Sequence, residues 1–322
     1  MGEKAKNEVT RTIIIPKKKT DWRVYFRRYW QLYALLSIPL IYLLIFKYAP
    51  MIFVQVAFKD YKFNMSVWNM PITKENGFMH FIKAFQDSDF RNALRNTLLL
   101  NGLDLIIGFP VPIIFALILN ELPFKGFKKT VQTIAYMPHF LSWVIIGSLS
   151  VQLFALDSGM VNMMLNSIGI KSIPFLTKGG NWVATYVGWG IWQSFGWNSI
   201  VYLAAIAGIS PELYEAASMD GAGRFAKMWH VTLPCLKPTI VVLLIMNLGY
   251  IMGGGMERPL ALSNNLIKDN AEVIATYVYH NGIKAGQFEL TTAVGLFQSV
   301  VGVILILSAN FISRKLGERG IW

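Results

Sequence analysis

The sequence has few of the residues from which catalytic and metal-binding sites are usually built. Its 322 residues include one cysteine, Cys235, and four scattered histidines, His80, His139, His230 and His280. A lone cysteine cannot form an internal disulfide, and these histidines lack metal-ligand spacing. No Gly-x-x-x-x-Gly-Lys-Ser/Thr phosphate loop is present, so we do not expect this chain to bind and split ATP. The sequence therefore predicts a non-catalytic protein that binds no metal or cofactor of its own.

Charge is also scarce. Only 15% of the residues are charged, whereas 54% are apolar and 14% aromatic, which is too apolar for a soluble domain of this length. Apolar runs recur at about the 20-residue length that crosses a bilayer core. They predict an all-α, polytopic membrane protein with six spans, at about 30–52, 94–119, 131–154, 182–206, 239–256 and 290–312.

The basic residues predict the orientation of these spans. If the chain has six spans, four of its segments lie on the same side of the membrane: the leader 1–29, the segment around Lys125–Lys129, the loop 208–238 and the tail. Together these segments hold 18 of the 30 Lys and Arg residues. This asymmetry places both termini in the cytoplasm. Basic flanks beside anionic head groups account for the net charge of +12 without nucleic acid. We expect a basic cytoplasmic leader, 1–29, followed by one six-span domain, 30–322.

The loop 208–238 is longer than a simple turn between spans needs to be. Ser210 followed by Pro211 is a good helix start, because proline at the first helical position loses no hydrogen bond. Ala216 and Ala217 leave one face open to close approach, and Gly221 can adopt the positive φ that a sharp break needs. The loop is predicted to form two short helices broken at Gly221, presented to a partner in the aqueous phase.

The string from Gly221 to Ala226 superficially matches a dinucleotide-binding motif. That motif requires a buried strand before the glycines, whereas a polar helix is expected here. We therefore interpret the match as accidental.

Asp104 is the one clear ionisable residue within a predicted span, where such groups are expensive and often functional. It is consistent with a structural carboxylate bonded to a neighbouring helix or near a water-filled cavity, with proton or ion coupling, or with contact to a polar substrate. The sequence favours the structural interpretation.

The fourth predicted span combines aromatic rings with amides. Tyr186, Gln193 and Trp197 follow each other at i, i+7 and i+11 and so share one helix face. Flat rings beside amides suit a sugar, although helix packing would use the same residues. The candidate substrate pathway consists of Tyr186, Trp189, Gln193, Trp197, Asn198, Asn247, Tyr250 and Gln298.

Several stretches resemble one family. Glu215-Ala216-Ala217-x-x-x-Gly221, followed after nine residues by Val231-x-Leu233-Pro234, resembles the EAA motif of permease subunits of binding-protein-dependent ABC importers. Other stretches resemble the sugar permeases related to the larger maltose permease subunit, and among these the lipo-oligosaccharide or complex-polysaccharide group. These stretches are Asp89-Phe90-x-x-Ala93-Leu94-x-Asn96-Thr97, Leu119-Asn120-Glu121-Leu122, Tyr136-Met137-Pro138-His139-Phe140-Leu141-Ser142-Trp143, Gly286-Gln287-Phe288 and Arg314-Lys315-Leu316-Gly317. The resemblance covers roughly residues 25–322.

The resemblance implies a type I ABC importer permease fold in a bacterial cell membrane. It further implies a second homologous permease, two ATPase subunits that carry ATP and Mg, an extracytoplasmic solute-binding protein, and an oligosaccharide or polysaccharide fragment as substrate. Coupling to the ATPases would use Glu215, Ala216, Ala217, Asp220 and Gly221.

One departure concerns the segment Gly253 to Arg258, where Met256 replaces an aromatic residue usual in the family.

Three alternatives remain at this level. The chain could be an ABC permease for a non-sugar solute. A secondary transporter would need acidic or histidine residues in several spans, and these are lacking. A membrane-embedded enzyme would need paired acids near the membrane surface, for which Asp87 and Asp89 are the nearest candidates.

Overall fold

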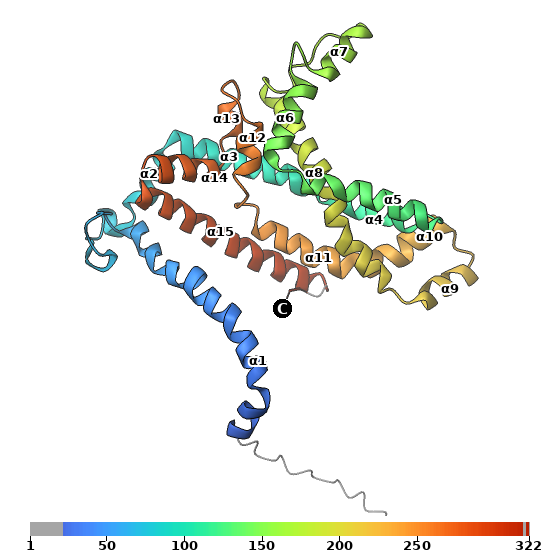
Figure 1. Ribbon diagram of the computed structural model, residues 1–322, viewed down its shortest axis with the longest axis horizontal. Helices are drawn as coiled ribbons and strands as arrows, with labels where there is room; N and C mark the ends of the chain where they lie inside the picture. The colour runs from blue at the N-terminus through green and yellow to red at the C-terminus, as the bar shows by residue number, and fades with distance from the viewer. Residues whose placement is uncertain (1–21, 318–319, 322) are drawn as a thin grey trace, which may run out of the picture. The chain divides into compact units, whose positions relative to one another are not determined.

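The computed structural model describes residues 22–317 and 320–321, and it is almost entirely helical (Figure 1). In this part of the chain the only β-type pairing is an isolated bridge between Lys59 and Ile72. The prediction of an all-α fold is confirmed. The chain divides into two compact units, residues up to Phe53 and residues from Val54 onward, and each is described separately.

The first unit is one apolar helical stretch. It consists of α1 (Trp22–Leu43), a π-helical turn η1 (Leu44–Tyr48) and the start of η2 (Ala49–Phe58). No residue of α1 or η1 is buried. The helix begins within the predicted leader 1–29, of which residues 1–21 lie outside the described part of the chain.

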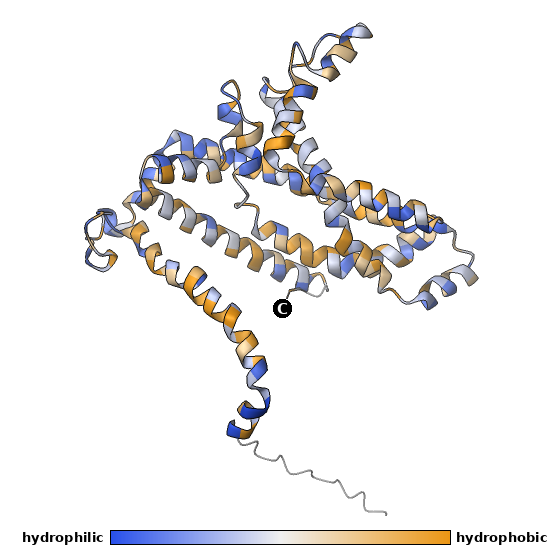
Figure 2. Ribbon diagram, in the orientation of Figure 1, coloured by the Kyte–Doolittle hydropathy of each residue, from blue (hydrophilic) through white to orange (hydrophobic). Residues whose placement is uncertain are grey.

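Membrane-length helices account for the predicted spans. Among the described residues, four helical stretches are long and apolar enough to cross a bilayer, and the number rises to six if each of two bent pairs is one span. Within the second unit, only 17–28% of the most apolar window of each long stretch is buried. Figure 2 shows the apolar residues distributed over these helices. Such large apolar surfaces are covered by lipid or by another protein.

The second span is built from α3 (Ser88–Leu103), a π-helical turn η5 (Asp104–Gly108) and α4 (Pro110–Asn120). Pro110 has no N–H to donate, and the N–H of Phe109 reaches back to the carbonyl of Asp104 at 2.9 Å. The helix therefore widens by one residue without breaking.

The third predicted span, 131–154, is interrupted. The stretch α5 (Lys125–Tyr136) with η6 (Met137–Phe140) meets α6 (Trp143–Phe154) at a bend of 100°. Pro138 lies in η6, and the Ser142 hydroxyl accepts a hydrogen bond from the N–H of Ile145, which starts the new helix. Proline followed by a capping serine explains the break that hydropathy alone did not predict.

The fourth span is the 29-residue helix α8 (Gly179–Ala207), which leads at a 72° bend into α9 (Pro211–Met219). In Figure 1, α4, α5 and α8 run side by side toward α9 and α10, and both α4 and α5 pack against α8.

The fifth span differs from the prediction at both ends. α10 (Arg224–Lys227), η7 (Met228–Thr232) and α11 (Leu233–Gly249) form one continuous helix that begins 15 residues before the expected start at 239. It ends at Gly249 rather than 256, before a run of glycines in which Gly254 has φ +130°.

The last part of the chain returns to the bundle. The short helices α12 (Glu257–Leu262), α13 (Lys268–Ala271) and α14 (Ile274–Val278) and the π-helical η8 (Tyr279–Lys284) precede α15 (Phe288–Lys315), which packs along α11. The remaining elements are η3 (Val67–Asn69), η4 (Glu75–Gly77), α2 (Met79–Gln86) and α7 (Met160–Ser167).

Three buried clusters hold the second unit together. One gathers Leu100, Ile146, Trp182 and Leu262 from α3, α6, α8 and α12. A second joins α2, α3, α14 and α15 around Phe90 and Tyr277, and the third joins α4, α8 and α11. The first and third clusters meet the two ends of α8, and a cavity lies between them.

Candidate functional site

The first candidate region is the turn between α9 and α10. Pro211 opens α9 after Ser210, as predicted, although the Ser210 side chain makes no capping hydrogen bond. The helix ends in a Schellman motif: the N–H of Ala222 donates to the carbonyl of Ala217 at 2.9 Å, and that of Gly221 donates to Ser218 at 3.0 Å. Gly221 has φ +80°, which confirms the predicted break.

The second helix of this region is not separate, because α10 continues into α11. No breaker stands between Lys227 and Leu233, and the π-helical turn η7 carries the helix up to Pro234. The apparent dinucleotide-binding string from Gly221 to Ala226 follows helix α9, not a strand, so it has no nucleotide-binding context.

The α9–α10 turn presents its side chains to solvent. Glu215, Ala216, Asp220 and Gly221 are exposed, and Ala217 is half-buried. Large apolar side chains stand among them: Met219 is 89% exposed, Phe225 83% and Trp229 64%. Sequence reasoning missed these three residues, although bulky apolar residues in an otherwise polar loop were a signal for them. We call Met219, Phe225 and Trp229 the apolar knobs.

Two contacts hold α9 in place. The Tyr214 hydroxyl lies 3.0 Å from the hydroxyl of Thr232, which is buried, and Lys227 Nζ donates to Ser218 Oγ at 2.7 Å. The turn therefore keeps its shape from within the chain while its outer side chains are left for a partner.

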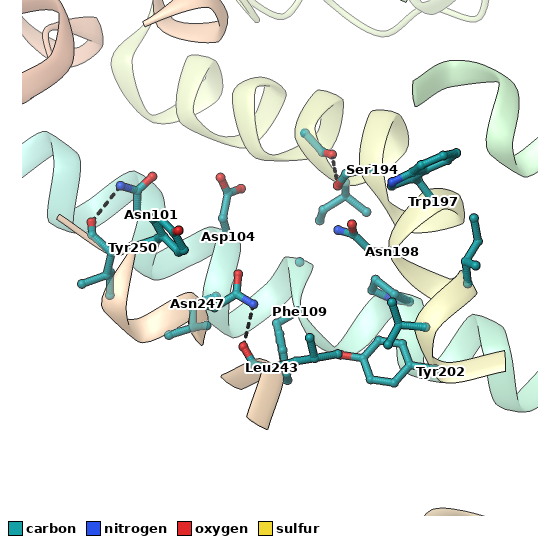
Figure 3. Close-up of a pocket in the computed structure, with 18 of the residues that line it drawn as sticks. Asn101, Asp104, Phe109, Ser194, Trp197, Asn198, Tyr202, Leu243, Asn247 and Tyr250 are labelled. Atoms are coloured by element: carbon teal, nitrogen blue, oxygen red, sulfur yellow. Dashed lines mark hydrogen bonds between the residues drawn. The ribbon is translucent and has the colours of Figure 1, made fainter. Parts of the chain in front are cut away.

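The second candidate region is a cavity of about 630 Å³ (Figure 3). Its walls come from α3 to α4, from α8, from α11 and the turn after it, and from Arg258 of α12. A volume of this size is typical of small-molecule sites, which usually range from about 300 to 1,000 Å³. Its polar lining residues are Asn101, Asp104, Ser194, Asn198, Tyr202, Asn247, Tyr250 and Arg258.

Asp104 forms an ion pair with Arg258. Arg258 Nη1 lies 2.6 Å from Oδ2 of Asp104, and Nη2 lies 3.3 Å from Oδ1, so the contact is bidentate. Nη2 also donates to the carbonyl of Tyr186 at 2.6 Å. The guanidinium carbon lies 3.7 Å from the centroid of the Tyr186 ring and 5.4 Å from that of Trp143. Asp104 is thus both bonded to a neighbouring element and part of the cavity wall, as its structural interpretation predicted.

Arg258 was not predicted as a partner of Asp104. It lies 154 residues away in sequence, and the segment before it stood out only through Met256. Gly190 makes room for the pair, because a Cβ at that position would collide with the guanidinium.

The eight predicted pathway residues divide into two groups. Trp197, Asn198, Asn247 and Tyr250 line the cavity. The others make packing contacts elsewhere: Tyr186 is buried beneath Arg258, Trp189 Nε1 donates to Ser150 Oγ at 3.0 Å, Gln193 donates to the carbonyl of His139 at 3.3 Å, and Gln298 donates to the carbonyl of Met252 at 2.6 Å.

The face of α8 that the sequence suggested for the substrate pathway is not the face that lines the cavity. At 100° per residue, the cavity-lining residues Gly190, Ser194 and Asn198 are centred about 80° from Tyr186, Gln193 and Trp197. Small and polar residues leave the space open, whereas the aromatic rings fill the contacts with neighbouring helices. Trp197 stands at the boundary, stacked on His139 with ring centroids 4.5 Å apart.

The polar groups that line the cavity are amides, hydroxyls and one ion pair. Among the described residues, no group of three or more His, Cys, Asp or Glu could hold a metal ion. Cys235 is exposed, consistent with a bystander thiol.

Comparison with known proteins gives consistent results. Residues 90–318 match the family model described as binding-protein-dependent transport system inner membrane component. Protein LplB of Bacillus subtilis (strain 168) is 42% identical over 310 residues, 96% of each chain. The polygalacturonan/rhamnogalacturonan transport system permease protein YteP of the same organism is 44% identical over 311 residues, again 96% of each chain.

A solved structure also matches. A chain of a bacterial alginate ABC transporter, in complex with an alginate pentasaccharide-bound periplasmic protein, is 42% identical, with a TM-score of 0.83 over 93% of this chain and 99% of that chain. The fold, the cavity and the α9–α10 turn can therefore be interpreted as parts of a transporter subunit.

Proposed function

The chain belongs to the family of binding-protein-dependent transport system inner membrane components, and we propose that it is the permease subunit of an ABC importer for oligosaccharides cut from polysaccharides. The observation that carries this proposal is the likeness, over nearly the whole chain, to a chain of the alginate ABC transporter. The relative YteP, named as a polygalacturonan/rhamnogalacturonan transport system permease protein, supports the choice of cargo.

The proposed complex contains a second homologous permease, two ATPase subunits and an extracytoplasmic solute-binding protein. ATP and Mg would be bound by the ATPases, since this chain has no phosphate loop. The α9–α10 turn is the contact proposed for an ATPase groove. Glu215 would meet a cation there, and the apolar knobs would fill an apolar part of the groove, because buried aromatic residues contribute most of the energy in such interfaces.

In this mechanism, closure of the ATPases on ATP moves the α9–α10 turn. α9 is tied through Tyr214 and Thr232 to η7, which continues into α11, and α9 follows directly from α8. Both α8 and α11 line the cavity, so movement of the turn would reach the cavity walls through rigid helices. With both termini in the cytoplasm, as the sequence predicts, the turn faces the ATPases.

The cavity suits a sugar that is held loosely. Amides of Asn198 and Asn247 and the hydroxyls of Ser194 and Tyr250 can pair with sugar hydroxyls, and the ring of Trp197 lies at its edge. The one cation in the lining, Arg258, is already paired with Asp104. We therefore propose that selection for charged sugars rests mainly on the binding protein or the partner permease.

The test is reconstitution of the whole complex in lipid vesicles. ATP hydrolysis and uptake should rise when the binding protein is loaded with alginate or galacturonan oligosaccharides, compared with neutral oligosaccharides and with an empty binding protein. Uptake driven by an ion gradient without ATP would instead favour a secondary transporter. ATP hydrolysis by the purified chain alone would also contradict the proposal.

A further inference from the structure

The segment that follows α11 crosses one end of the cavity and is tied to several helices. We call residues 250–262 the strap. Asn101 Nδ2 donates to the carbonyls of Ile251 and Gly253, both at 2.8 Å. Gln298 Nε2 on α15 donates a hydrogen bond to the carbonyl of Met252 at 2.6 Å, and Trp182 Nε1 donates to the carbonyl of Leu262 at 2.8 Å. Side chains thus replace the helix hydrogen bonds that the strap lacks.

The strap lies at the end of the cavity that is farther from the α9–α10 turn. Along α8, Gly190 is the first residue to line the cavity, and Gly190 touches Arg258. From Gly190 to Ala207, where α8 ends before α9, the helix rises about 26 Å at 1.5 Å per residue. We call this the distal end of the cavity.

Arg258 joins the strap to two walls of the cavity at once. It pairs with Asp104 on η5 and donates to Tyr186 on α8, and its side chain is only 14% exposed. Among the described lining residues it is the only Lys or Arg, and Asp104 is the only acid. The Asp104 carboxylate is 30% exposed, so water can replace the guanidinium there once the bidentate contact is broken.

The strap also contains a place to bend. Gly253, Gly254 and Gly255 stand together, Gly254 has φ +130°, and a Cβ at Gly255 would meet no atom within 4 Å. Movement at these glycines, together with release of the Trp182 contact to Leu262, would carry Arg258 away from Asp104 while α11 stays in place. Hinges commonly consist of a few small residues between rigid elements.

We propose that Arg258 and Asp104 form a latch that holds the strap across the distal end of the cavity, and that this ion pair must open before cargo can pass. Both are positioning residues: they act by setting the place of the strap. The inference rests on the proposed function only in taking the distal end as the side from which cargo enters.

The lone cysteine makes a direct test possible. Cys235→Ser removes the exposed native thiol, and Ser194→Cys places a reporter in the cavity wall. The full chain is expressed with its partner subunits, and a membrane-impermeant thiol reagent is applied either to intact cells or to inverted membrane vesicles. The rate of labelling per inserted chain is measured for the native pair, Asp104→Asn, Arg258→Gln and Arg258→Lys.

The latch predicts that labelling from the distal side rises several-fold in Asp104→Asn and Arg258→Gln and less in Arg258→Lys, which keeps the charge but loses the bidentate contact. Labelling from the opposite side should stay unchanged. Glu272→Gln is the matched control, because it removes the carboxylate that pairs with His280 at 3.2 Å outside the cavity.

Equal distal labelling in the native chain, Asp104→Asn and Arg258→Gln would overturn the latch. If either of these variants failed to insert, unchanged labelling in the milder Arg258→Lys would also overturn it. The labelling needs neither ATP nor sugar, so it is independent of the transport assay. A latch response without ATP-driven uptake would reject the proposed function alone, and uptake without a latch response would reject only the latch.

Discussion

The α9–α10 turn and the strap are both irregular connections next to α11, yet they are built in opposite ways. The turn leaves Glu215 and the apolar knobs in solvent and uses few contacts to hold its shape. The strap has carbonyls bonded to side chains of α3, α8 and α15, and its one arginine is paired with Asp104 on η5. The difference indicates that the turn is made to contact another protein, whereas the strap is made to contact this chain.

The largest effect should come from crowding the latch. Gly190→Val would push the Arg258 guanidinium off Asp104, and the overpacking should lower stability by about 1–3 kcal/mol. Thermal unfolding of the purified chain in detergent measures this. Gly188→Val is the matched control, since it lies two residues away on α8 with no atom within 4 Å of its Cβ. Equal melting temperatures would show that Gly190 does not support the pair.

The next effect should appear at the turn and only in the complex. Gly221→Trp would place an indole where an ATPase groove is proposed, and binding-protein-stimulated ATP hydrolysis should fall several-fold. Gly169→Trp has the same backbone strain, with φ +81° against +80°, and equally open surroundings. Its stimulation should remain near that of the native chain. Similar losses in both variants would point to backbone strain rather than docking.

The apolar knobs should contribute less individually. Phe225→Ser removes an exposed ring, and loss of one aromatic contact in an interface should weaken docking by about 1–2 kcal/mol. Affinity of the isolated ATPase for the permease pair in nanodiscs is the measurement. Phe63→Ser, which removes a ring that is 93% exposed far from the turn in sequence, should change nothing. Unaltered affinity for Phe225→Ser would leave Glu215 as the main contact.

The smallest effect concerns the cavity wall. Asn198→Ala should raise the sugar concentration needed for half-maximal uptake about fivefold, which corresponds to one hydrogen bond of about 1 kcal/mol, with the amount of complex unchanged. Gln193→Ala, by contrast, removes a contact to the backbone of His139 and should lower assembly instead. If Asn198→Ala lowered assembly and Gln193→Ala weakened uptake instead, the helix face first predicted from the sequence would be the one that contacts the sugar.

The sequence predicted what depends on local pattern. Apolar runs located the spans, and Ser210, Pro211 and Gly221 located α9 and its end, because helix starts and positive-φ turns follow from individual residue types. The resemblance of Glu215-Ala216-Ala217 and Gly221 to the EAA motif pointed to the family.

Features that depend on distant contacts were beyond this reasoning. The bend at Pro138 and the end of α11 have local signals in Pro138, Ser142 and the glycine run, but the side chains that satisfy the freed carbonyls come from other helices. The pairing of Asp104 with Arg258 joins residues 154 positions apart, and the face of α8 toward the cavity is set by its neighbours. Periodicity shows which residues share one face of a helix, but it does not show whether that face contacts the cavity or a neighbouring helix.

Amide hydrogen exchange compares the two regions most directly. Exchange is followed in the permease pair alone and after addition of the ATPase subunits. We predict that amides of residues 213–229 exchange rapidly in the pair and slow markedly in the complex, whereas the strap amides of Ile251, Gly253 and Leu260, which donate hydrogen bonds, exchange slowly in both. A turn whose exchange is the same with and without the ATPases, or a strap that becomes protected only in the complex, would contradict the account.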